Sequence, residues 1–375
     1  MGTLAASFYQ PRGAGRRSDP HHRRQSAERA GGLLGHEIAI IRVDASSAQQ
    51  AITTMDRMAT QEKVDIFSGT YLSAMSNSGS DAAARYNKLW WETQGLAREL
   101  TEHGLPNYIS AGSNGDYFAL VSAKAVIEMI APQLKKSPKD VSVWIEHEDS
   151  IYGTSIAEVQ QKILGEAGVK VLGKSAHPAR ATELTDSVLR AKRANPDVWM
   201  ETGCVPDRNL LLRAARDQGF KPAALLWSGV GDTPETRDAF GADFVEGMLV
   251  TAYARADVPE SYGPGAAAFL ANYRARYNRE PIAPQGLGAN SGLRMPFDTI
   301  KAAGSVDLEK IKAAAVTMDK PISSDANDYG LKFDQNFQNV LSLPTVVQWQ
   351  GGEVKTVYPT TAKRDFIAIR NIARG

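Results

Sequence analysis

Residues 141–172, VSVWIEHEDSIYGTSIAEVQQKILGEAGVKVL, carry the clearest architectural signal in the chain. Val141–Glu146 is apolar and rich in β-branched residues, which predicts a strand, and Val169–Leu172 predicts a second strand. Between them, Thr154–Ala167 predicts a helix that ends at Gly168, in the position where glycine commonly terminates helices. A strand, a helix and a strand in this order predict a βαβ unit with two parallel strands.

The same alternation extends toward both ends of the chain. Because strands and helices recur about once every thirty residues, the pattern predicts an α/β fold with parallel sheets and helices on both faces. There are too many strands for one sheet of ordinary width, so we expect two doubly wound lobes. The expected strands are Glu37–Val43, Asp65–Gly69, Leu89–Trp91, Val198–Glu201, Ala224–Trp227, Leu331–Phe333 and the hairpin of Val346–Gln350 with Val354–Tyr358; the expected helices are Ser46–Gln61, Ser73–Tyr86, Tyr117–Leu134, Thr182–Ala194, Pro206–Gln218, Pro264–Tyr277 and Gly286–Ala303. In the first helix, one face should hold Ala48, Ile52, Met55 and Met58.

Composition limits the classes of function. At 375 residues the chain suits two domains, and 43% hydrophobic with 23% charged residues is typical of a globular protein. The 43 basic and 42 acidic residues give a net charge of +1, which argues against nucleic acid or an anionic membrane as a partner. The single cysteine, Cys204, excludes an internal disulfide. No apolar run is long enough to span a membrane, and none follows the first Met as in a signal peptide.

Residues 1–30 differ from the rest of the chain. They contain six Arg, two His and two acidic residues without periodicity, which predicts a disordered or mis-started arm.

Two short patterns point toward other chemistry. Gly168–Ser175 matches the GxxxxGK[ST] pattern of a phosphate-binding loop, but its middle residues favour a strand, so an NTP-using enzyme is a weak alternative. Glu146–Asp149 could supply metal ligands, yet alternate side chains point apart on a strand, so solvated charges are the expected reading. Without HExxH or GxSxG, the sequence predicts no enzyme, and thus no catalytic residue, metal or cofactor.

Polar and aromatic side chains gather where predicted strands end, and open α/β sheets bind ligands at those ends. Ser73 follows the strand Asp65–Gly69, Thr93 follows Leu89–Trp91, Tyr152 follows the strand that ends at Glu146, and Cys204 follows Val198–Glu201. Helices begin nearby, and their free amide groups suit a carboxylate. We therefore expect a small carboxylate as the ligand.

Taken together, the sequence resembles the type I periplasmic binding proteins that include the leucine/isoleucine/valine-binding protein. The resemblance runs from about Ala30 to the C-terminus. It rests on GGLLG at 31–35, KVDIFSGTYLS at 63–73, WWETQGLARELTEHG at 90–104, Ile151-Tyr152-Gly153, LLLRAARDQGFKP at 210–222, VEGMLVTAY at 245–253 and FDQNFQNVLSLPTVVQWQGGEV at 333–354.

The resemblance implies two Rossmann-like lobes, joined by a three-crossing hinge, with the ligand between them. The N-terminal lobe would comprise 31–117 and 253–326, and the C-terminal lobe 118–252 and 327–375. The family's ligand contacts fall on Tyr71, Leu72, Ser73, Trp91, Glu92, Thr93, Tyr152, Cys204, Val205 and Ser228.

Two departures from the family pattern matter. Ser228 replaces the acid that takes the α-ammonium group in amino-acid-binding relatives. Either Glu92 replaces that acid, or the ligand has no amine, and Trp90 and Trp91 would suit an aromatic ligand. The family also begins with a central strand and a glycine-rich turn, which residues 1–30 do not provide.

The expected function is thus that of a solute-binding protein for an ABC importer. The protein would be periplasmic or lipid-anchored outside the cytoplasm, would act as a monomer and would bind no nucleic acid. It would capture an amino acid or amino-acid-like carboxylate, including an aromatic one, by hinge closure and pass it to a membrane permease. The alternative is a cytoplasmic ligand-sensing regulator with the same two lobes.

Overall fold

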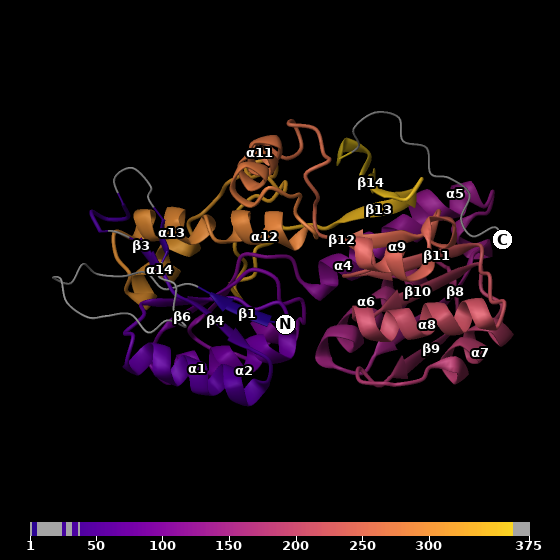
Figure 1. The fold of residues 1–375 in the computed structure, drawn as a ribbon, viewed down its shortest axis with the longest axis horizontal. Helices are drawn as coiled ribbons and strands as arrows, with labels where there is room; N and C mark the ends of the chain where they lie inside the picture. Colours follow the sequence, from indigo (N-terminus) through magenta and orange to yellow (C-terminus); the bar gives the residue numbers. More distant parts are fainter. Residues whose placement is uncertain (1, 6–24, 28–31, 37, 363–375) are drawn as a thin grey trace. The chain divides into compact units, whose positions relative to one another are not determined.

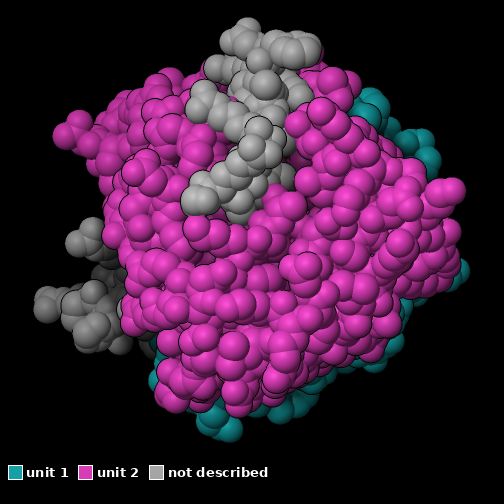
Figure 2. Space-filling model, turned by 90° about the vertical axis from the view of Figure 1, so that its right-hand side faces the viewer, with its two compact units in different colours: residues 1–114, 288–324, 329–342 teal, residues 115–287, 325–328, 343–375 magenta. Residues whose placement is uncertain are grey.

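The computed structural model describes residues 2–5, 25–27, 32–36 and 38–362. The chain divides into two compact units, coloured separately in Figure 2. Unit 1 comprises residues 1–114, 288–324 and 329–342, and unit 2 comprises 115–287, 325–328 and 343–375. If the short stretch 325–328 is set aside, the chain passes between the units after residues 114, 287 and 342.

Unit 1 contains a five-stranded sheet of order β4-β1-β5-β6-β7. The strands β5, β6 and β7 are parallel, whereas β1 runs antiparallel to β4 and β5. Their bounds are β1 Gly2–Ala5, β4 Arg42–Ala45, β5 Ile66–Ser68, β6 Leu89–Glu92 and β7 Tyr108–Ser110; β2 Gln25–Ala27 pairs separately with β3 Ile38–Ile40. The unit's helices are α1 Ala48–Thr60, α2 Ser73–Ala84, α3 Glu99–Glu102, α13 Met295–Ala303 and α14 Leu308–Ala315.

The strand β1 corrects the expectation of an arm without a central strand. Gly2–Ala5 has no strand pattern of its own, but it fills the space between β4 and β5 and gives their backbone groups partners. Only long-range pairing produces this strand, so the local sequence could not predict it. Apart from 2–5 and 25–27, the predicted arm lies outside the described residues.

Unit 2 contains a seven-stranded sheet of order β14-β13-β12-β11-β10-β8-β9 (Figure 1). The strands from β9 to β12 in this order are parallel, and β13 and β14 complete the sheet as an antiparallel hairpin. The strands are β8 Ser142–Glu148, β9 Lys170–His177, β10 Val198–Thr202, β11 Ala224–Ser228, β12 Leu249–Ala252, β13 Thr345–Gln350 and β14 Glu353–Tyr358. The helices are α4 Gly115–Lys124, the π-helix η1 Ala125–Ile130, α5 Ala131–Gln133, α6 Ile151–Glu166, α7 Thr185–Ala194, α8 Val205–Asp217, α9 Pro234–Phe240, α10 Ala242–Val245 and α11 Ala266–Tyr277, with short 3-10 turns at Pro138–Asp140 and Thr360–Ala362; α12 Gln285–Gly292 spans the division between the units.

The central strands β10, β11 and β12 of unit 2 are buried on both faces, as is typical of parallel sheets. In β10, Val198 and Met200 pack into one core with residues of η1 and α6, whereas Trp199 packs into a second core with residues of α7 and α8. Helices therefore cover both faces of the sheet. This is the doubly wound arrangement predicted from the sequence.

The unit boundaries differ from the predicted lobes mainly in two places, apart from the short stretches 115–117 and 325–326, which also belong to unit 2. Residues 253–287 belong to unit 2, because Val258, Tyr262 and Leu287 form a small core with Ala326 and Ala362. Residues 329–342 belong to unit 1, because Tyr329, Leu331 and Phe333 pack in the core of unit 1. Shared cores rather than the order of elements decide both assignments.

Two predicted elements also differ. The expected strand Leu331–Phe333 forms only isolated bridges, from Leu331 to Lys320 and from Phe333 to Asn339. The expected helix Gly286–Ala303 is divided into α12 and α13, and Pro296 lies in the first turn of α13, where proline is tolerated.

Gly79 offers a test of the packing of α2 on β6. A Cβ atom at Gly79 would lie 2.5 Å from the ring of Trp90, which is fully buried. We expect Gly79→Ala to lower the free energy of unfolding by about 1–3 kcal/mol, because a packed core does not accept the extra methyl group. Gly165→Ala is the matched control in α6, since nothing lies within 4 Å of its Cβ position; it should raise stability by up to about 1 kcal/mol. Urea denaturation measures both, and a Gly79→Ala protein as stable as the parent would contradict this packing.

Candidate functional site

Unit 1 brings the segments after β5 and β6 together. Because β5 and β6 are parallel, their carboxyl ends lie at the same edge of the sheet, where α2 begins at Ser73. The Ser73 hydroxyl accepts hydrogen bonds from the backbone N–H groups of Leu96 and Ala97, each at 3.1 Å. Ser73 is only 5% exposed. Its oxygen thus fixes the loop after β6, while its O–H proton remains available for donation.

Glu92 is the organising side chain of this edge. One carboxylate oxygen accepts the N–H groups of Thr93, Gln94 and Gly95, each at 2.8 Å. The other oxygen accepts the N–H of Thr70 at 3.1 Å, the Trp90 indole N–H at 3.2 Å and the Ser76 hydroxyl. Glu92 is fully buried, and burial raises the pKa of its carboxyl group despite these donors. The interpretation of Glu92 as an acceptor for a ligand amine is therefore wrong, because donors of the protein already occupy both oxygens.

The paired tryptophans do not face a ligand. Trp91 packs edge-on against Phe333, with ring centroids 6.0 Å apart, and donates its indole N–H to the carbonyl of Gly292 at 3.0 Å. Trp90 points to the other face of the sheet, against Phe67 and Gly79. Both tryptophans have no exposed surface. Their expected contact with an aromatic ligand is wrong, because successive residues of a buried strand fill opposite cores.

The other predicted residues of unit 1 surround the start of α2. Leu72 immediately precedes the helix and is 37% exposed, and Tyr71 is half-buried. Thr93 is buried, and its carbonyl would lie 2.2 Å from a Cβ atom at Gly112. Ser113 follows Gly112, and its fully buried hydroxyl has no hydrogen-bond partner within the described part of the chain. Ser113 therefore places a hydroxyl that is unpartnered among the described residues close to Thr93.

In unit 2, Tyr152 lies across the end of β11. Ser150 caps α6 by accepting the N–H of Tyr152 at 3.3 Å, and the Tyr152 hydroxyl donates to the carbonyl of Ser228 at 3.0 Å. A Cβ atom at Gly229 would lie 2.0 Å from the Tyr152 hydroxyl oxygen, so only glycine permits this approach. The Ser228 side chain is fully buried and accepts from the Gln160 amide at 3.2 Å. The Ser228 side chain therefore lies in the protein interior and does not line the surface of the site.

Cys204 and Val205 begin α8 and are both half-buried. Asp207 closes a capping box by accepting the N–H of Cys204 at 2.9 Å. Burial raises the pKa of the Cys204 thiol to about 12, so the group is neutral. Val205 and the neutral thiol give this part of unit 2 an apolar character.

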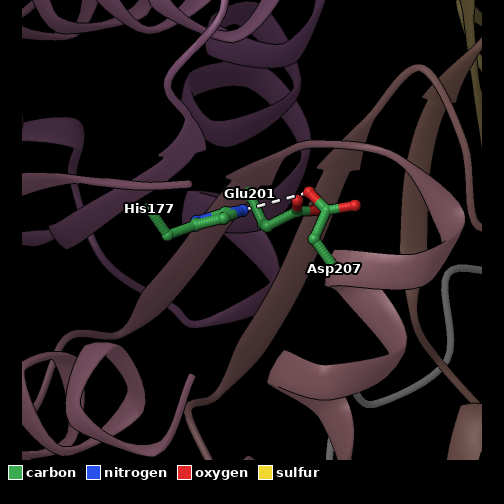
Figure 3. Close-up of side chains that lie close together, drawn as sticks. All are labelled: His177, Glu201 and Asp207. Atoms are coloured by element: carbon green, nitrogen blue, oxygen red, sulfur yellow. Dashed lines mark hydrogen bonds and ion pairs between the residues drawn. The ribbon is translucent and has the colours of Figure 1, made fainter. Parts of the chain in front are cut away.

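Beneath the start of α8 lies a buried ionic network that no local sequence pattern indicates (Figure 3). The two ring nitrogens of His177 contact Glu146 at 2.9 Å and Asp207 at 3.0 Å. Beside them, Glu201 pairs with Arg208 at 2.6 Å, and the Arg208 guanidinium lies 4.3 Å from the centre of the Trp227 ring. The exposed fraction of the four ionic groups His177, Asp207, Glu201 and Arg208 does not exceed 1%.

Burial controls the ionisation of this network. Burial alone would lower the pKa of His177, but hydrogen bonds to Asp207 and Glu146 raise it to about 10. Burial raises the pKa of Glu201 to about 7, against the opposing effect of Arg208. The expectation of solvated charges at Glu146–Asp149 is wrong for its first three residues, because Glu146, His147 and Glu148 are buried. Their strand continues into the sheet as far as Glu148, so their side chains face the packed helices and neighbouring strands.

The phosphate-loop pattern at 168–175 is a strand in the structure. Gly168 follows the end of α6 with a positive φ of 78°, and β9 then runs from Lys170 to His177. The Ser175 hydroxyl donates to Glu146. No helix begins at Lys174, so the loop that would wrap a phosphate is not formed.

Sequence and structure comparisons agree with this architecture. A family model described as periplasmic binding protein matches residues 23–353. The chain is 31% identical over 333 residues to Leu/Ile/Val-binding protein homolog 7 of Brucella suis. The aligned region covers 88% of this chain and 84% of that protein. The chain therefore belongs to the periplasmic binding protein family.

Solved structures share the fold. The leucine-binding protein LivK of Thermotoga maritima superposes with a TM-score of 0.72 at 22% identity, covering 88% of this chain and 89% of that chain. A solute-binding protein of an ABC transporter from Rhodopseudomonas palustris, in complex with 4-hydroxybenzoate, gives a TM-score of 0.69 at 19% identity, covering 86% and 85%. The predicted type I periplasmic binding protein fold is confirmed. In the described residues, the structure has no helix with the length and hydropathy of a membrane span.

Proposed function

We propose that this protein is the solute-binding component of an ABC importer and captures a small organic carboxylate. The ligand takes contacts from both units, which close around it, and the closed form is recognised by a membrane permease. The protein acts as a monomer outside the cytoplasm, in the periplasm or on a lipid anchor. The names of its relatives, which are binding proteins, support the assignment to this class.

The observation that carries the proposal is the Ser73 hydroxyl at the N-terminus of α2. Its oxygen accepts two backbone N–H groups, which leaves its own proton for donation to a ligand. The 12-residue helix α2 begins at Ser73, so the backbone amides of its first turn lie next to this hydroxyl. A helix N-terminus favours an anion. A carboxylate satisfies this set of donors, whereas a cation does not.

The acids near the strand ends argue for a ligand without an ammonium group. Each has donors of its own: Glu92 in unit 1, and in unit 2 Glu148 with Ser150 and Gly153, Asp207 with Cys204 and His177, and Glu201 with Arg208. An ammonium group buried without a carboxylate partner is costly. Since Ser228 stands where amino-acid-binding relatives carry an acid, we place a plain organic acid, such as an aromatic carboxylate, ahead of an α-amino acid. The R. palustris protein with bound 4-hydroxybenzoate shows that this fold accepts such a ligand.

A cytoplasmic ligand-sensing regulator remains the second candidate, since the same fold can transmit ligand binding to a partner protein. The genomic sequence around the reading frame distinguishes the two. An in-frame apolar leader and neighbouring permease genes are expected for the importer component, and a neighbouring regulatory gene without permease genes favours the regulator.

Ser73→Ala tests the binding role directly. We expect the mutation to weaken binding of the carboxylate ligand about 10- to 100-fold, since a hydrogen bond to a charged group contributes about 1.5–3 kcal/mol. Isothermal titration calorimetry measures the affinity. Ser73→Thr keeps the hydroxyl and should retain binding, and Ser78→Ala on the same helix, whose hydroxyl bonds only to the carbonyl of Ala74, is the matched control. Equal affinities for Ser73→Ala and the parent protein would remove Ser73 from the site.

A further inference from the structure

The buried network beneath α8 contains an unpartnered ligand atom. One potential metal-binding atom from each of His177, Glu201 and Asp207 lies within 4.8 Å of the other two. The Oε2 atom of Glu201 pairs with Arg208, but its Oε1 atom is buried and has no hydrogen-bond partner among the described residues. Glu201 is only 1% exposed. A buried carboxylate oxygen without a donor is costly, so this position calls for a cation or a proton.

We propose that His177, Glu201 and Asp207 bind one divalent transition-metal ion of the Zn²⁺ class. We assign as ligating atoms Nε2 of His177 and Oδ2 of Asp207, which lie 3.0 Å apart, and Oε1 of Glu201, which is unpartnered among the described residues (Figure 3). Nitrogen and carboxylate oxygen are ligands of this class of ion. Ligand atoms of a tetrahedral zinc ion lie about 3.4 Å apart, which follows from bond lengths of about 2.1 Å. In the structure, Nε2 of His177 and Oδ2 of Asp207 are 3.0 Å apart, and one ligand atom from each of the three residues lies within 4.8 Å of the others. The expected spacing falls between these two values.

The groups around the three ligands match what a metal site requires. The Nδ1 atom of His177 contacts Glu146 at 2.9 Å, which holds the ring in place, and the ion would replace the proton that Nε2 shares with Oδ2 of Asp207 at 3.0 Å. Arg208 holds Glu201 by two hydrogen bonds at 2.6 and 2.7 Å, so Oε1 has a fixed direction. The residue between the two carboxylates is Gly203, where a Cβ atom would lie 2.2 Å from Oδ2 of Asp207 and 2.3 Å from Oε1 of Glu201. Glycine therefore keeps the space between the two acids open.

The charges of the network are compatible with a divalent ion. The network holds three carboxylates, of Glu146, Glu201 and Asp207, with one guanidinium, of Arg208. A neutral His177 and an ion of charge +2 make the sum zero. Burying an unbalanced charge is unfavourable.

Cobalt provides a spectroscopic test on the full chain. Protein without a histidine tag is freed of metal with EDTA, dialysed at pH 8 and titrated with Co²⁺, because the ion must replace the proton on His177. We expect visible d–d absorption that saturates at one Co²⁺ per chain and disappears when Zn²⁺ is added. A titration without saturable absorption, or one unaffected by Zn²⁺, overturns the proposal.

The variant Glu201→Gln identifies the site. The glutamine can keep the bond to Arg208 through its carbonyl oxygen, and its amide can donate to Asp207, so we expect it to fold. Its affinity for Co²⁺ should fall at least 10-fold, while His36→Gln, which removes an exposed imidazole in unit 1, should bind as the parent does. If a proton rather than a metal occupies the position, Glu201→Gln will raise the melting temperature and Co²⁺ will bind neither protein, which contradicts the proposal.

Discussion

Glu92→Ala is expected to abolish ligand binding and to lower the free energy of unfolding of unit 1 by about 3–5 kcal/mol, the usual effect of removing one partner from a buried ionic or hydrogen-bonded group. The mutation leaves the amides of Thr70, Thr93, Gln94 and Gly95 without their acceptor in a buried environment. Because those amides belong to the segments that precede α2 and follow β6, both candidate binding loops of unit 1 lose their conformation. Urea denaturation and calorimetric titration with the ligand measure the two effects.

The control is Glu99→Ala, which removes an exposed carboxylate a few residues away. It should change stability by less than about 0.5 kcal/mol and leave binding intact. Glu92→Gln keeps the shape of the side chain but turns an amide N–H toward backbone donors. Its loss of stability should therefore lie between those of Glu92→Ala and Glu99→Ala. A Glu92→Ala protein with normal stability and affinity would show that the loops do not depend on this carboxylate.

Arg208→Ala should have the second large effect, about 3–5 kcal/mol of lost stability in unit 2. Arg208 has no exposed surface, pairs with Glu201 and stacks on the Trp227 ring. Its removal leaves Glu201 buried beside Asp207 without its guanidinium partner and opens a cavity against the indole. The loss is best followed by urea denaturation with circular dichroism.

Arg213→Ala is the matched control for Arg208→Ala, since Arg213 lies on α8 as well but is exposed. We expect a change below about 0.5 kcal/mol for this surface residue. If the two variants lose the same amount of stability, the buried network does not stabilise unit 2 as described.

Periodic local patterns predicted most of the fold. Alternating strands and helices indicated doubly wound lobes, and the apolar face of α1 was correct for Met55 and Met58. The same pattern placed Ala48 inside, although it is exposed, and missed the buried Ala51. Hydrophobic periodicity fixes the direction of a face better than its edges, because the tilt of the helix on the sheet decides which residues at the margin are covered.

The candidate site was less predictable, because its side chains depend on long-range register. The sequence indicated Ser73 and Thr93, since a hydroxyl after a strand is a local signal. It could not show that Glu92 is saturated by donors, because Thr70 and Ser76 are far from it along the chain. The contact between Glu146 and His177 likewise requires the parallel pairing of β8 with β9.

The central claim is that the protein binds a small carboxylate without needing an amine on it. The most direct test is the melting temperature of the full chain across a panel of aliphatic and aromatic acids, their uncharged amides and the α-amino acids. We expect at least one acid to raise the melting temperature in a concentration-dependent way while its amide does not. A folded protein that no acid stabilises, or that is stabilised equally by an acid and its amide, would contradict it.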